Sequence, residues 1–259
     1  MTQENHEILK NFIMLLEKGE LRAAKKNGDG IWETNTLVKE NILKVFKNSK
    51  LIKFPATQAF SENFIDKELL PAREFHLSDK VRLVPGGSTV RTGAYVGKNV
   101  VILPPSYINI GAFIDENTMI DSHVLVGSCA QIGKGVHLSA AVQIGGVLEP
   151  IGNRPVIVED DCFIGANVVL TEGIIVKKMA VIAAGVCLSS SVPIYDCVNE
   201  KILFGEIPEG AVVVPGTRPF LKNDWAVKSN LQMNCALIIK YRDNKTTSHV
   251  ALESALRSF

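Results

Sequence analysis

The stretch FIDENTMIDSHVLVGSCAQIGKGVHL, residues 113–138, carries an aliphatic side chain at every sixth position. The same period extends from Val84 to Leu188, with one break between Ile144 and Val158. An α-helix repeats every 3.6 residues and does not produce this spacing, whereas short flat strands joined by tight turns do. Three hexads make one triangular coil, and stacked coils bury their aliphatic residues in a continuous column. The positions are Val84, Val90, Val96, Ile102, Ile108, Ile114, Ile120, Val126, Ile132, Leu138, Ile144, Val158, Ile164, Leu170, Val176, Ile182 and Leu188.

A second small or aliphatic residue follows each of these positions by four, as at Val124 and Val136. Glycine often comes directly after the aliphatic residue, as at Gly127 and Gly165, and we expect a turn with positive φ at these glycines. The repeat predicts a mainly β protein whose central part is a parallel β-helix.

Two further parts flank the repeat. Residues 1–80 read as a mainly helical domain, because 6–20 and 36–50 each place their apolar residues on one helical face. Asn35 precedes the second of these segments and is a typical N-cap residue. We expect the coil stack to occupy residues 81–193.

Residues 194–259 read as a small C-terminal β/α extension. Two short strands are expected on either side of the turn at 208–210, followed by an apolar strand at 236–239 and a short helix at 250–256.

Composition limits the classes of partner. The chain has 259 residues and a net charge of +1, which gives no electrostatic reason to expect nucleic acid or an anionic membrane. No apolar run approaches the roughly 20 residues of a membrane span, and the polar N-terminus carries no signal-peptide pattern. Five cysteines without paired spacing indicate reduced thiols, so a cytoplasmic location is expected.

The break in the repeat indicates a loop. Ile144 and Val158 are fourteen residues apart, two more than two hexads, and Pro150 and Pro155 lie between them. We expect this loop to leave the stack and return, either to build a ligand wall or as an insertion without function. Glu149 at its border is either a loop anchor or part of a site wall.

Several motifs are more specific than the hexad itself. They are GELRAA at 19–24 with Trp32, SYINIGAFIDE at 106–116, VGSCAQIGK at 126–134, IGGVLEP at 144–150 and VEDDCFIGA at 158–166. Together they cover most of the chain. This set resembles the tetrahydrodipicolinate N-succinyltransferase family of hexapeptide-repeat acyltransferases.

The resemblance implies a function and an assembly. That family transfers a succinyl group from succinyl-CoA to the amine of the ring-opened form of a cyclic dicarboxylic imine, in lysine and diaminopimelate biosynthesis. It implies a left-handed coil and a homotrimer with active sites between neighbouring prisms. Succinyl-CoA is then a co-substrate, and no tightly bound cofactor is expected.

The carboxylates and the amine of the acceptor indicate two substrate-binding residues. Arg82 matches the family's substrate-binding arginine, and a planar guanidinium suits a carboxylate. Asp121 matches the substrate-binding aspartate and is the expected catalytic residue, because a carboxylate can hold the amine and take its proton. The alternative for Asp121 is a turn aspartate that accepts backbone hydrogen bonds. Arg91 is expected to be an exposed edge arginine, and Asp115 an ordinary turn residue.

Coenzyme A is expected to lie along small residues. The segments 165–166 and 183–185 are eighteen residues apart and therefore stack on successive coils. We assign Ala166, Ala184 and Gly185 to the pantetheine wall, although small residues recur in any hexad.

Histidine offers two other chemistries, both less favoured. His123 and His137 are candidate bases of the kind that hydroxyl-directed acetyltransferases use, but an amine needs such a base less than an alcohol does. Zinc needs three convergent histidines, and these two lie fourteen residues apart rather than eighteen with no third in the stack. No metal site is expected.

One departure leaves the donor and the mechanism open. Many family members continue Ile-Gly-Ala with Arg-Ser-Glu, and this chain has Asn-Val-Val at 167–169. A glutamate-centred mechanism is therefore in doubt. An acetyltransferase on the same acceptor or on an amino sugar remains an alternative. A non-catalytic prism is disfavoured, because the outward positions are mixed rather than a uniform array.

Overall fold

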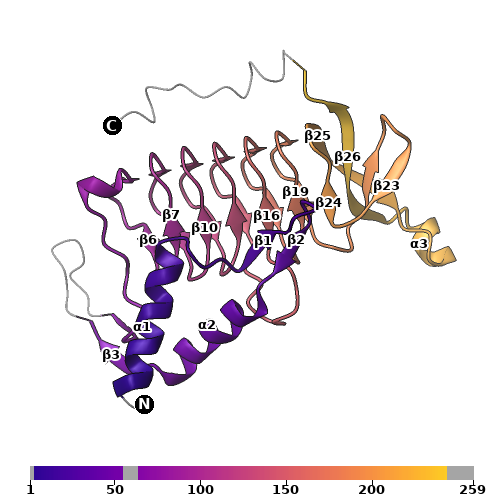
Figure 1. The fold of residues 1–259 in the computed structure, drawn as a ribbon. Coiled ribbons are helices and arrows are strands. Elements are labelled where there is room, and N and C mark those ends of the chain that lie inside the picture. Colours follow the sequence, from indigo (N-terminus) through magenta and orange to yellow (C-terminus); the bar gives the residue numbers. More distant parts are fainter. Residues whose placement is uncertain (1–2, 55–63, 244–259) are drawn as a thin grey trace.

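The computed structural model describes residues 3–54 and 64–243 (Figure 1). A triangular stack of coils forms the centre, and two helices with a short hairpin lie along one side of it. The helices are α1 (Gln3–Glu17) and α2 (Thr36–Asn48). Each coil contributes one short strand to each of three parallel sheets, and a strand pairs with the strand three further along the chain. The chain folds as the predicted left-handed parallel β-helix.

The three sheets are named here by their strands. Sheet 1 comprises β7 (Tyr95–Val96), β10 (Phe113–Ile114), β13 (Gln131–Ile132), β16 (Ile157–Val158), β19 (Ile175–Val176) and β24 (Glu206–Ile207). Sheet 2 begins with β5 (Arg82–Leu83), β8 (Val101–Ile102), β11 (Met119–Ile120), β14 (His137–Leu138), β17 (Phe163–Ile164) and β20 (Val181–Ile182). Sheet 3 comprises β6 (Thr89–Val90), β9 (Tyr107–Ile108), β12 (Leu125–Val126), β15 (Gln143–Ile144), β18 (Val169–Leu170) and β21 (Cys187–Leu188). The turns from sheet 1 to sheet 2 form edge A, those from sheet 2 to sheet 3 edge B, and those from sheet 3 to sheet 1 edge C.

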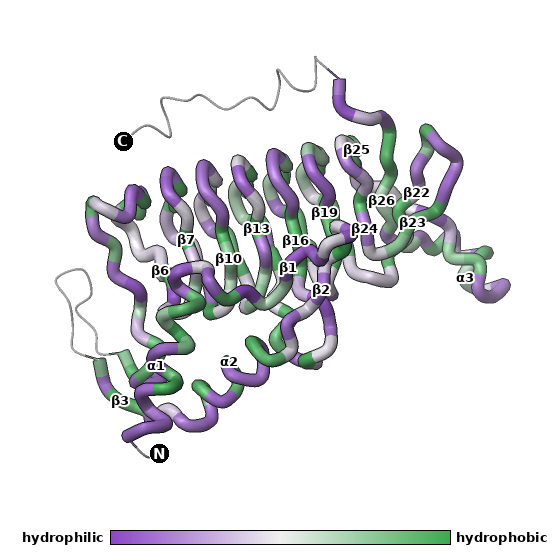
Figure 2. Tube along the Cα trace, in the orientation of Figure 1, coloured by the Kyte–Doolittle hydropathy of each residue, from purple (hydrophilic) through white to green (hydrophobic). Residues whose placement is uncertain are grey.

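The register explains the hexad. In each strand the second residue points inward and pairs with its equivalent on the next coil, as Ile120 does with Leu138. Figure 2 shows these apolar positions alternating with polar turns along the stack. Ile114, Ile120 and Ile132 are each fully buried, and burying such a side chain stabilises the fold by roughly 1.5–3 kcal/mol. The predicted aliphatic column is confirmed from Val90 to Leu188. Val84 was wrong, because Leu83 pairs with Ile102 and takes the inward position in the first coil.

The expected role of the glycines was wrong. Gly127 and Gly165 do not have positive φ; they lie where successive turns nearly touch. A Cβ on Gly165 would come within 2.6 Å of the backbone nitrogen of Ala184. The left-handed residue of each turn comes two positions later, for example Cys129 with φ of 70° and Asn167 with φ of 58°. Glycine after the aliphatic residue therefore reflects close packing between coils.

The N-terminal segment covers sheet 1. Asn35 caps α2 as predicted, since its side chain accepts a hydrogen bond from the backbone of Val38 at 3.3 Å. A hairpin of β1 (Ala24–Lys26) and β2 (Trp32–Thr34) lies against the same sheet, where Ala24 and Trp32 contact buried isoleucines of β16 and β19. A second hairpin, β3 (Leu51–Lys53) with β4 (Ile65–Lys67), follows α2. The 3₁₀ turn η1 (Leu77–Asp79) leads into the stack.

The stack runs beyond residue 193, where the repeat in the sequence stops. Strand β24 continues sheet 1 beside β19, and β25 (Ala211–Pro219) continues sheet 2 beside β20. A hairpin of β22 (Ile194–Asp196) and β23 (Lys201–Leu203) interrupts this last coil. Ile207 and Val213 still occupy the buried column, so an inserted hairpin hides one more coil from the hexad pattern.

The C-terminal part adds strand β26 (Gln232–Tyr241), antiparallel to β25, and the short helix α3 (Asp224–Lys228) between them. The expected strand at 236–239 lies within β26, and the expected helix at 250–256 lies outside the described residues. Over the described ranges, no helix has the length and apolar character needed to cross a bilayer.

Candidate active site

Edge B brings together most of the residues that the sequence selected. Asp121 follows β11, Ala166 follows β17, and Ala184 and Gly185 follow β20, all in turns that lead from sheet 2 to sheet 3. Coils rise by about 4.8 Å, so Asp121 lies roughly 10 Å from the level of Ala166 and roughly 14 Å from that of Ala184. Arg82 lies on the outer face of β5, two strands from β11 in the other direction. These residues form a row along one side of the prism.

Asp121 is partly committed to its own turn. Its Oδ1 accepts a hydrogen bond from the backbone nitrogen of Ser122 at 2.7 Å. Asp115 and Asn109 make the same bond to the residue after them, at 2.8 Å each. This bond serves the turn and is available to either aspartate or asparagine. The Oδ2 of Asp121 has no hydrogen-bond partner among the described residues, so one carboxylate oxygen remains for a ligand.

The wall between Asp121 and Gly185 has small side chains at its surface. Ala166 is half-buried, whereas Ala184 and Gly185 are exposed. Gly185 has φ of 77° and nothing within 4 Å of a Cβ placed on it. A long flexible ligand meets little steric hindrance along this edge, and backbone groups of the turns are within its reach.

The two histidines occupy different places. His123 is exposed in the same turn as Asp121, with φ of 63°. His137 lies on the outer face of β14, and its ring centroid is 5.0 Å from that of Phe163. No group of three possible metal ligands is found in the described part of the chain.

Residues 167–169, which differ from the family pattern, lie in the turn after β17 and at the start of β18. Asn167 occupies the left-handed position of its turn and is exposed, Val168 points into the core, and Val169 lies on the outer face of sheet 3. None of the three side chains is ionisable. Any base at this edge must therefore come from another turn, and Asp121 is the carboxylate of edge B nearest to it.

The extruded loop lies at edge C, away from the row. It joins β15 of sheet 3 to β16 of sheet 1, and its tip is held by α2, because the buried Lys39 donates to the carbonyl of Asn153. Arg154 donates to the carbonyl of Gly173 at 3.0 Å. Within one chain the loop is a packed connection to the helical domain, and Glu149 is exposed at its start. These contacts hold the loop against the helical domain and do not decide between a ligand wall and an insertion without function.

Arg91 differs from expectation. It was expected to be an exposed edge arginine, but its side chain is only 14% exposed and forms an ion pair with Asp66. Its guanidinium also lies 5.1 Å from the ring of Phe46. The sequence did not reveal this because both partners come from the helical domain, more than twenty residues earlier.

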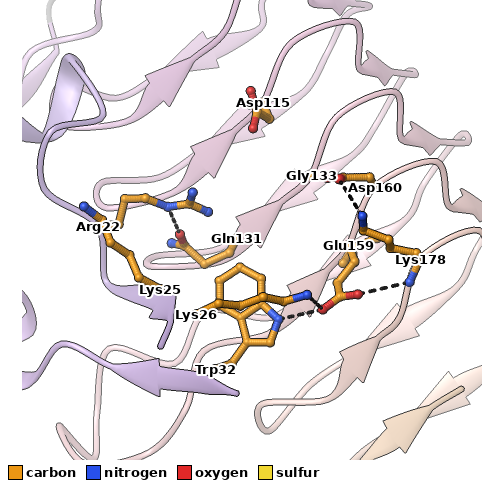
Figure 3. Close-up of a pocket in the computed structure, with 11 residues that line it drawn as sticks. Arg22, Lys25, Lys26, Trp32, Asp115, Gln131, Gly133, Glu159, Asp160 and Lys178 are labelled. Carbon is orange, nitrogen blue, oxygen red and sulfur yellow. Dashed lines mark hydrogen bonds and ion pairs between the residues drawn. The ribbon is translucent and has the colours of Figure 1, made fainter. Parts of the chain in front are cut away.

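A second polar site, missed in the sequence, lies where the β1–β2 hairpin meets sheet 1 and edge A (Figure 3). We call it the Arg22 cleft, and it has a volume of about 420 Å³. Its lining includes Arg22, Trp32, Asp115, Gln131, Glu159 and Lys178. It is on the opposite side of sheet 2 from edge B.

Glu159 joins the hairpin to the prism at this cleft. Its carboxylate is 7% exposed and accepts from the Trp32 indole at 2.8 Å, from Lys26 at 2.7 Å and from the backbone of Lys178 at 3.2 Å. Burial by itself opposes ionisation, but the hydrogen bonds from Lys26 and Trp32 outweigh it and hold the pKa of Glu159 below its usual value. The sequence signal was present, since Trp32 and Glu159 both belong to the family-like motifs.

The buried cysteines take no part in either site. Cys129 and Cys162 are enclosed in apolar surroundings, and burial raises the pKa of Cys129 to about 12. A thiol with this pKa stays protonated at neutral pH and is a poor nucleophile. Both residues are core side chains.

Comparisons with known proteins agree over nearly the whole chain. Residues 1–47 match the family model described as the tetrahydrodipicolinate N-succinyltransferase N-terminal domain, and residues 155–190 match the hexapeptide repeat of succinyl-transferase. A 2,3,4,5-tetrahydropyridine-2,6-dicarboxylate N-succinyltransferase from Nitrobacter hamburgensis is 42% identical over 98% of this chain and 90% of its own. A protein of the same name from Idiomarina loihiensis is 42% identical over 94% of this chain and 86% of its own. Another from Buchnera aphidicola is 42% identical over 98% and 90%.

Proposed function

This chain belongs to the tetrahydrodipicolinate N-succinyltransferase family, and on that basis we propose that edge B carries the acyl transfer of lysine and diaminopimelate biosynthesis. The enzyme is a CoA-dependent N-acyltransferase, with succinyl-CoA as donor and the ring-opened form of tetrahydrodipicolinate as acceptor. The row of Arg82, Asp121, Ala166 and Ala184 along one side of the prism is the observation on which this assignment depends.

Asp121 is assigned to hold the acceptor amine. The carboxylate oxygen Oδ2 is available for an ammonium, and Oδ1 fixes the side chain through the Ser122 nitrogen. A positioned carboxylate favours the loss of a proton and so makes the amine nucleophilic. Arg82 is assigned to a carboxylate of the acceptor, which it can bind through two parallel hydrogen bonds.

In the proposed reaction the acceptor amine attacks the thioester of succinyl-CoA. The amine nitrogen forms a bond to the thioester carbonyl carbon, and the carbon–sulfur bond breaks. An ammonium has three protons and the product amide has one. One of the two protons lost goes to Asp121 and on to water, and the other goes to the sulfur, so coenzyme A leaves as its thiol. The pantetheine arm lies along Ala166, Ala184 and Gly185, which present little steric hindrance.

The assembly is proposed to be a homotrimer in the cytoplasm. Met119 and Phe163 on sheet 2, and Leu125 and Val169 on sheet 3, lie on outer faces of the prism, and each is only half-buried. A neighbouring prism would bury them and would close a groove along edge B. Five free thiols are compatible with a reducing compartment. Light scattering should give about three times 28.2 kDa, and a monomer would contradict the proposal.

The donor is tested directly by thiol release. We expect coenzyme A to be released from succinyl-CoA only when the cyclic imine is present, and much more slowly from acetyl-CoA. Faster release from acetyl-CoA would favour the alternative acetyltransferase, and release without the imine would show a different acceptor. Substituting an amino sugar for the imine tests the remaining alternative in the same assay.

A further inference from the structure

The Arg22 cleft contains a guanidinium that is held in place but has no acceptor at its outer end. Its Nε donates to the side-chain oxygen of Gln131 at 2.9 Å, and its Cζ lies 3.5 Å from the centre of the Phe113 ring. Gln131 is itself buried and donates to the carbonyl of Cys129 at 2.8 Å, so its orientation is fixed. Neither Nη group of Arg22 forms a hydrogen bond within the described residues. In Figure 3 the Nη end points away from Gln131, toward the side where Asp115 lies.

Asp115 is the carboxylate of the cleft with an available oxygen. Its Oδ1 accepts from the Glu116 nitrogen at 2.8 Å, and its Oδ2 has no hydrogen-bond partner in the residues that the structure describes. Asp115 and Arg22 are close enough for the carboxylate to favour the charged guanidinium, yet they form no ion pair with each other. A gap therefore separates an open cation from an open anion.

The other charges of the cleft have partners, although the exposed Lys25 donates only to the carbonyl of Glu20, at 3.2 Å. Glu159 accepts three hydrogen bonds from Trp32, Lys26 and Lys178. Asp160 accepts from the backbone of Lys134 at 3.0 Å and lies 3.7 Å from the ammonium of Lys178. The half-buried charged groups of the cleft without a side-chain ion pair in the described residues are the guanidinium fork of Arg22 and Oδ2 of Asp115, on opposite sides of the gap.

We propose that the Arg22 cleft binds a free α-amino acid, with its carboxylate on the Nη groups of Arg22 and its ammonium on Oδ2 of Asp115. A planar guanidinium fork matches a carboxylate, and the Nη groups of the half-buried Arg22 are open to a ligand in the cleft. A volume of about 420 Å³ is within the range of small-molecule sites. The ligand would contact the N-terminal segment and the prism at once and hold them together. This site is separate from edge B and does not depend on the acyl transfer proposed there.

Trp32 provides the readout. The chain has two tryptophans, and Trp225 is 70% exposed on α3, so a Trp225→Phe protein reports on Trp32 alone. This protein is titrated with glycine, L-alanine, L-glutamate and L-lysine to about 10 mM, because a small ligand with two charged contacts reaches millimolar affinity. We expect a saturable change in emission with at least one of the four. Succinate and 1,5-diaminopentane carry one kind of charge each and should give none. No response to any amino acid, or an equal response to succinate, would overturn the proposal.

Three further substitutions locate the ligand. Asp115→Asn should weaken binding about tenfold or more, and the turn should persist because Asn109 makes the same backbone bond. Glu116→Gln removes a neighbouring charge outside the cleft and should change affinity less than about twofold. Asp121→Asn should bind as the parent does. If Glu116→Gln weakened amino-acid binding as much as Asp115→Asn, the effect would come from the overall negative charge near the cleft and not from a contact with Asp115. Loss of binding in Asp121→Asn would place the ligand at edge B. Either result contradicts the proposal.

Discussion

The turns of edges A and B share one backbone pattern, but different segments of the chain lie beside them. Asp115 on edge A and Asp121 on edge B occupy the same place in the hexad, and each accepts a hydrogen bond from the next residue through Oδ1. The β1–β2 hairpin brings Arg22 and Trp32 next to Asp115, whereas the turns that follow Asp121 along edge B carry small side chains, as at Ala166 and Ala184. The repeat therefore determines at which turn positions a carboxylate can lie. What lies against the edge determines which ligand it can meet.

The largest effect is expected at edge B. Asp121→Asn keeps the hydrogen bond to Ser122, as Asn109 keeps its own to Ile110, but it removes the charge that holds the acceptor ammonium. Because positioned acid–base groups contribute roughly 10²–10⁴-fold, kcat/KM for the acceptor should fall by about that range. Steady-state thiol release measures the loss, and circular dichroism checks that the fold is kept.

The control for this substitution is Glu116→Gln, which also removes one exposed carboxylate from a turn. Activity of Glu116→Gln should stay within about twofold of the parent. If Asp121→Asn turns over at a near-normal rate, Asp121 is only a turn residue. The two edges would then differ in their surroundings but not in catalytic function.

The second effect is on stability and belongs to edge A. Glu159→Gln removes charge-assisted hydrogen bonds from Lys26 and Trp32, so the free energy of unfolding should fall by about 1.5–3 kcal/mol at pH 7. The pKa of Glu159 lies below its ordinary value of 4.5, so this stabilisation is present above that pH and is lost as the pH falls through the lower folded-state pKa. Denaturant unfolding should therefore show the difference between parent and variant shrinking in acid.

Asp160→Asn is the matched control on the same edge. Its ion pair with Lys178 is exposed and 3.7 Å long, and an asparagine can still accept from the backbone of Lys134. The loss should stay below about 1 kcal/mol. Equal losses in the two variants would mean that the hairpin is not attached through Glu159 in particular.

These cases show how far the sequence determines the structure. The inward positions from Val90 onward were predicted correctly because the hexad is a local pattern that the coils repeat, and Asn35 was identified because capping is also local. The β22–β23 hairpin hid the last coil, since an insertion destroys the period without ending the stack.

Of the two candidate sites, one could be predicted from the sequence and the other could not. The row on edge B followed from stacking at eighteen residues together with family-like motifs. The Arg22 cleft did not, because its hydrogen bond to Gln131 spans 109 residues, and only the folded chain shows which face of the stack the helical domain covers. Lys39 was missed for a similar reason, since burying a lysine requires an acceptor that the distant loop supplies.

The third prediction concerns Arg82 on the outer face of β5. Arg82→Lys keeps the positive charge and loses the planar fork, so kcat/KM for the acceptor should fall about tenfold or more. The KM for succinyl-CoA should hardly change, because Arg82 is not assigned to the donor. Arg91→Lys provides a contrast: the Arg91 side chain is 14% exposed, pairs with Asp66 and lies beside the Phe46 ring, so the substitution should lower the melting temperature while the acceptor KM stays the same. The reverse outcome would exchange the roles of the two arginines.

The smallest effect tests the donor wall of edge B. Ala184 is exposed in the turn after β20, three coils from Asp121, and Ala184→Leu places a branched side chain where the pantetheine arm is assigned. The KM for succinyl-CoA should rise about fivefold, because steric hindrance at one point of a long flexible ligand removes only part of its binding energy. Lys98→Leu adds an exposed leucine at the equivalent turn position of edge A and should leave that KM within about twofold. Equal KM values for parent and Ala184→Leu would show that the donor follows another surface, and edge B would then retain only its acceptor residues.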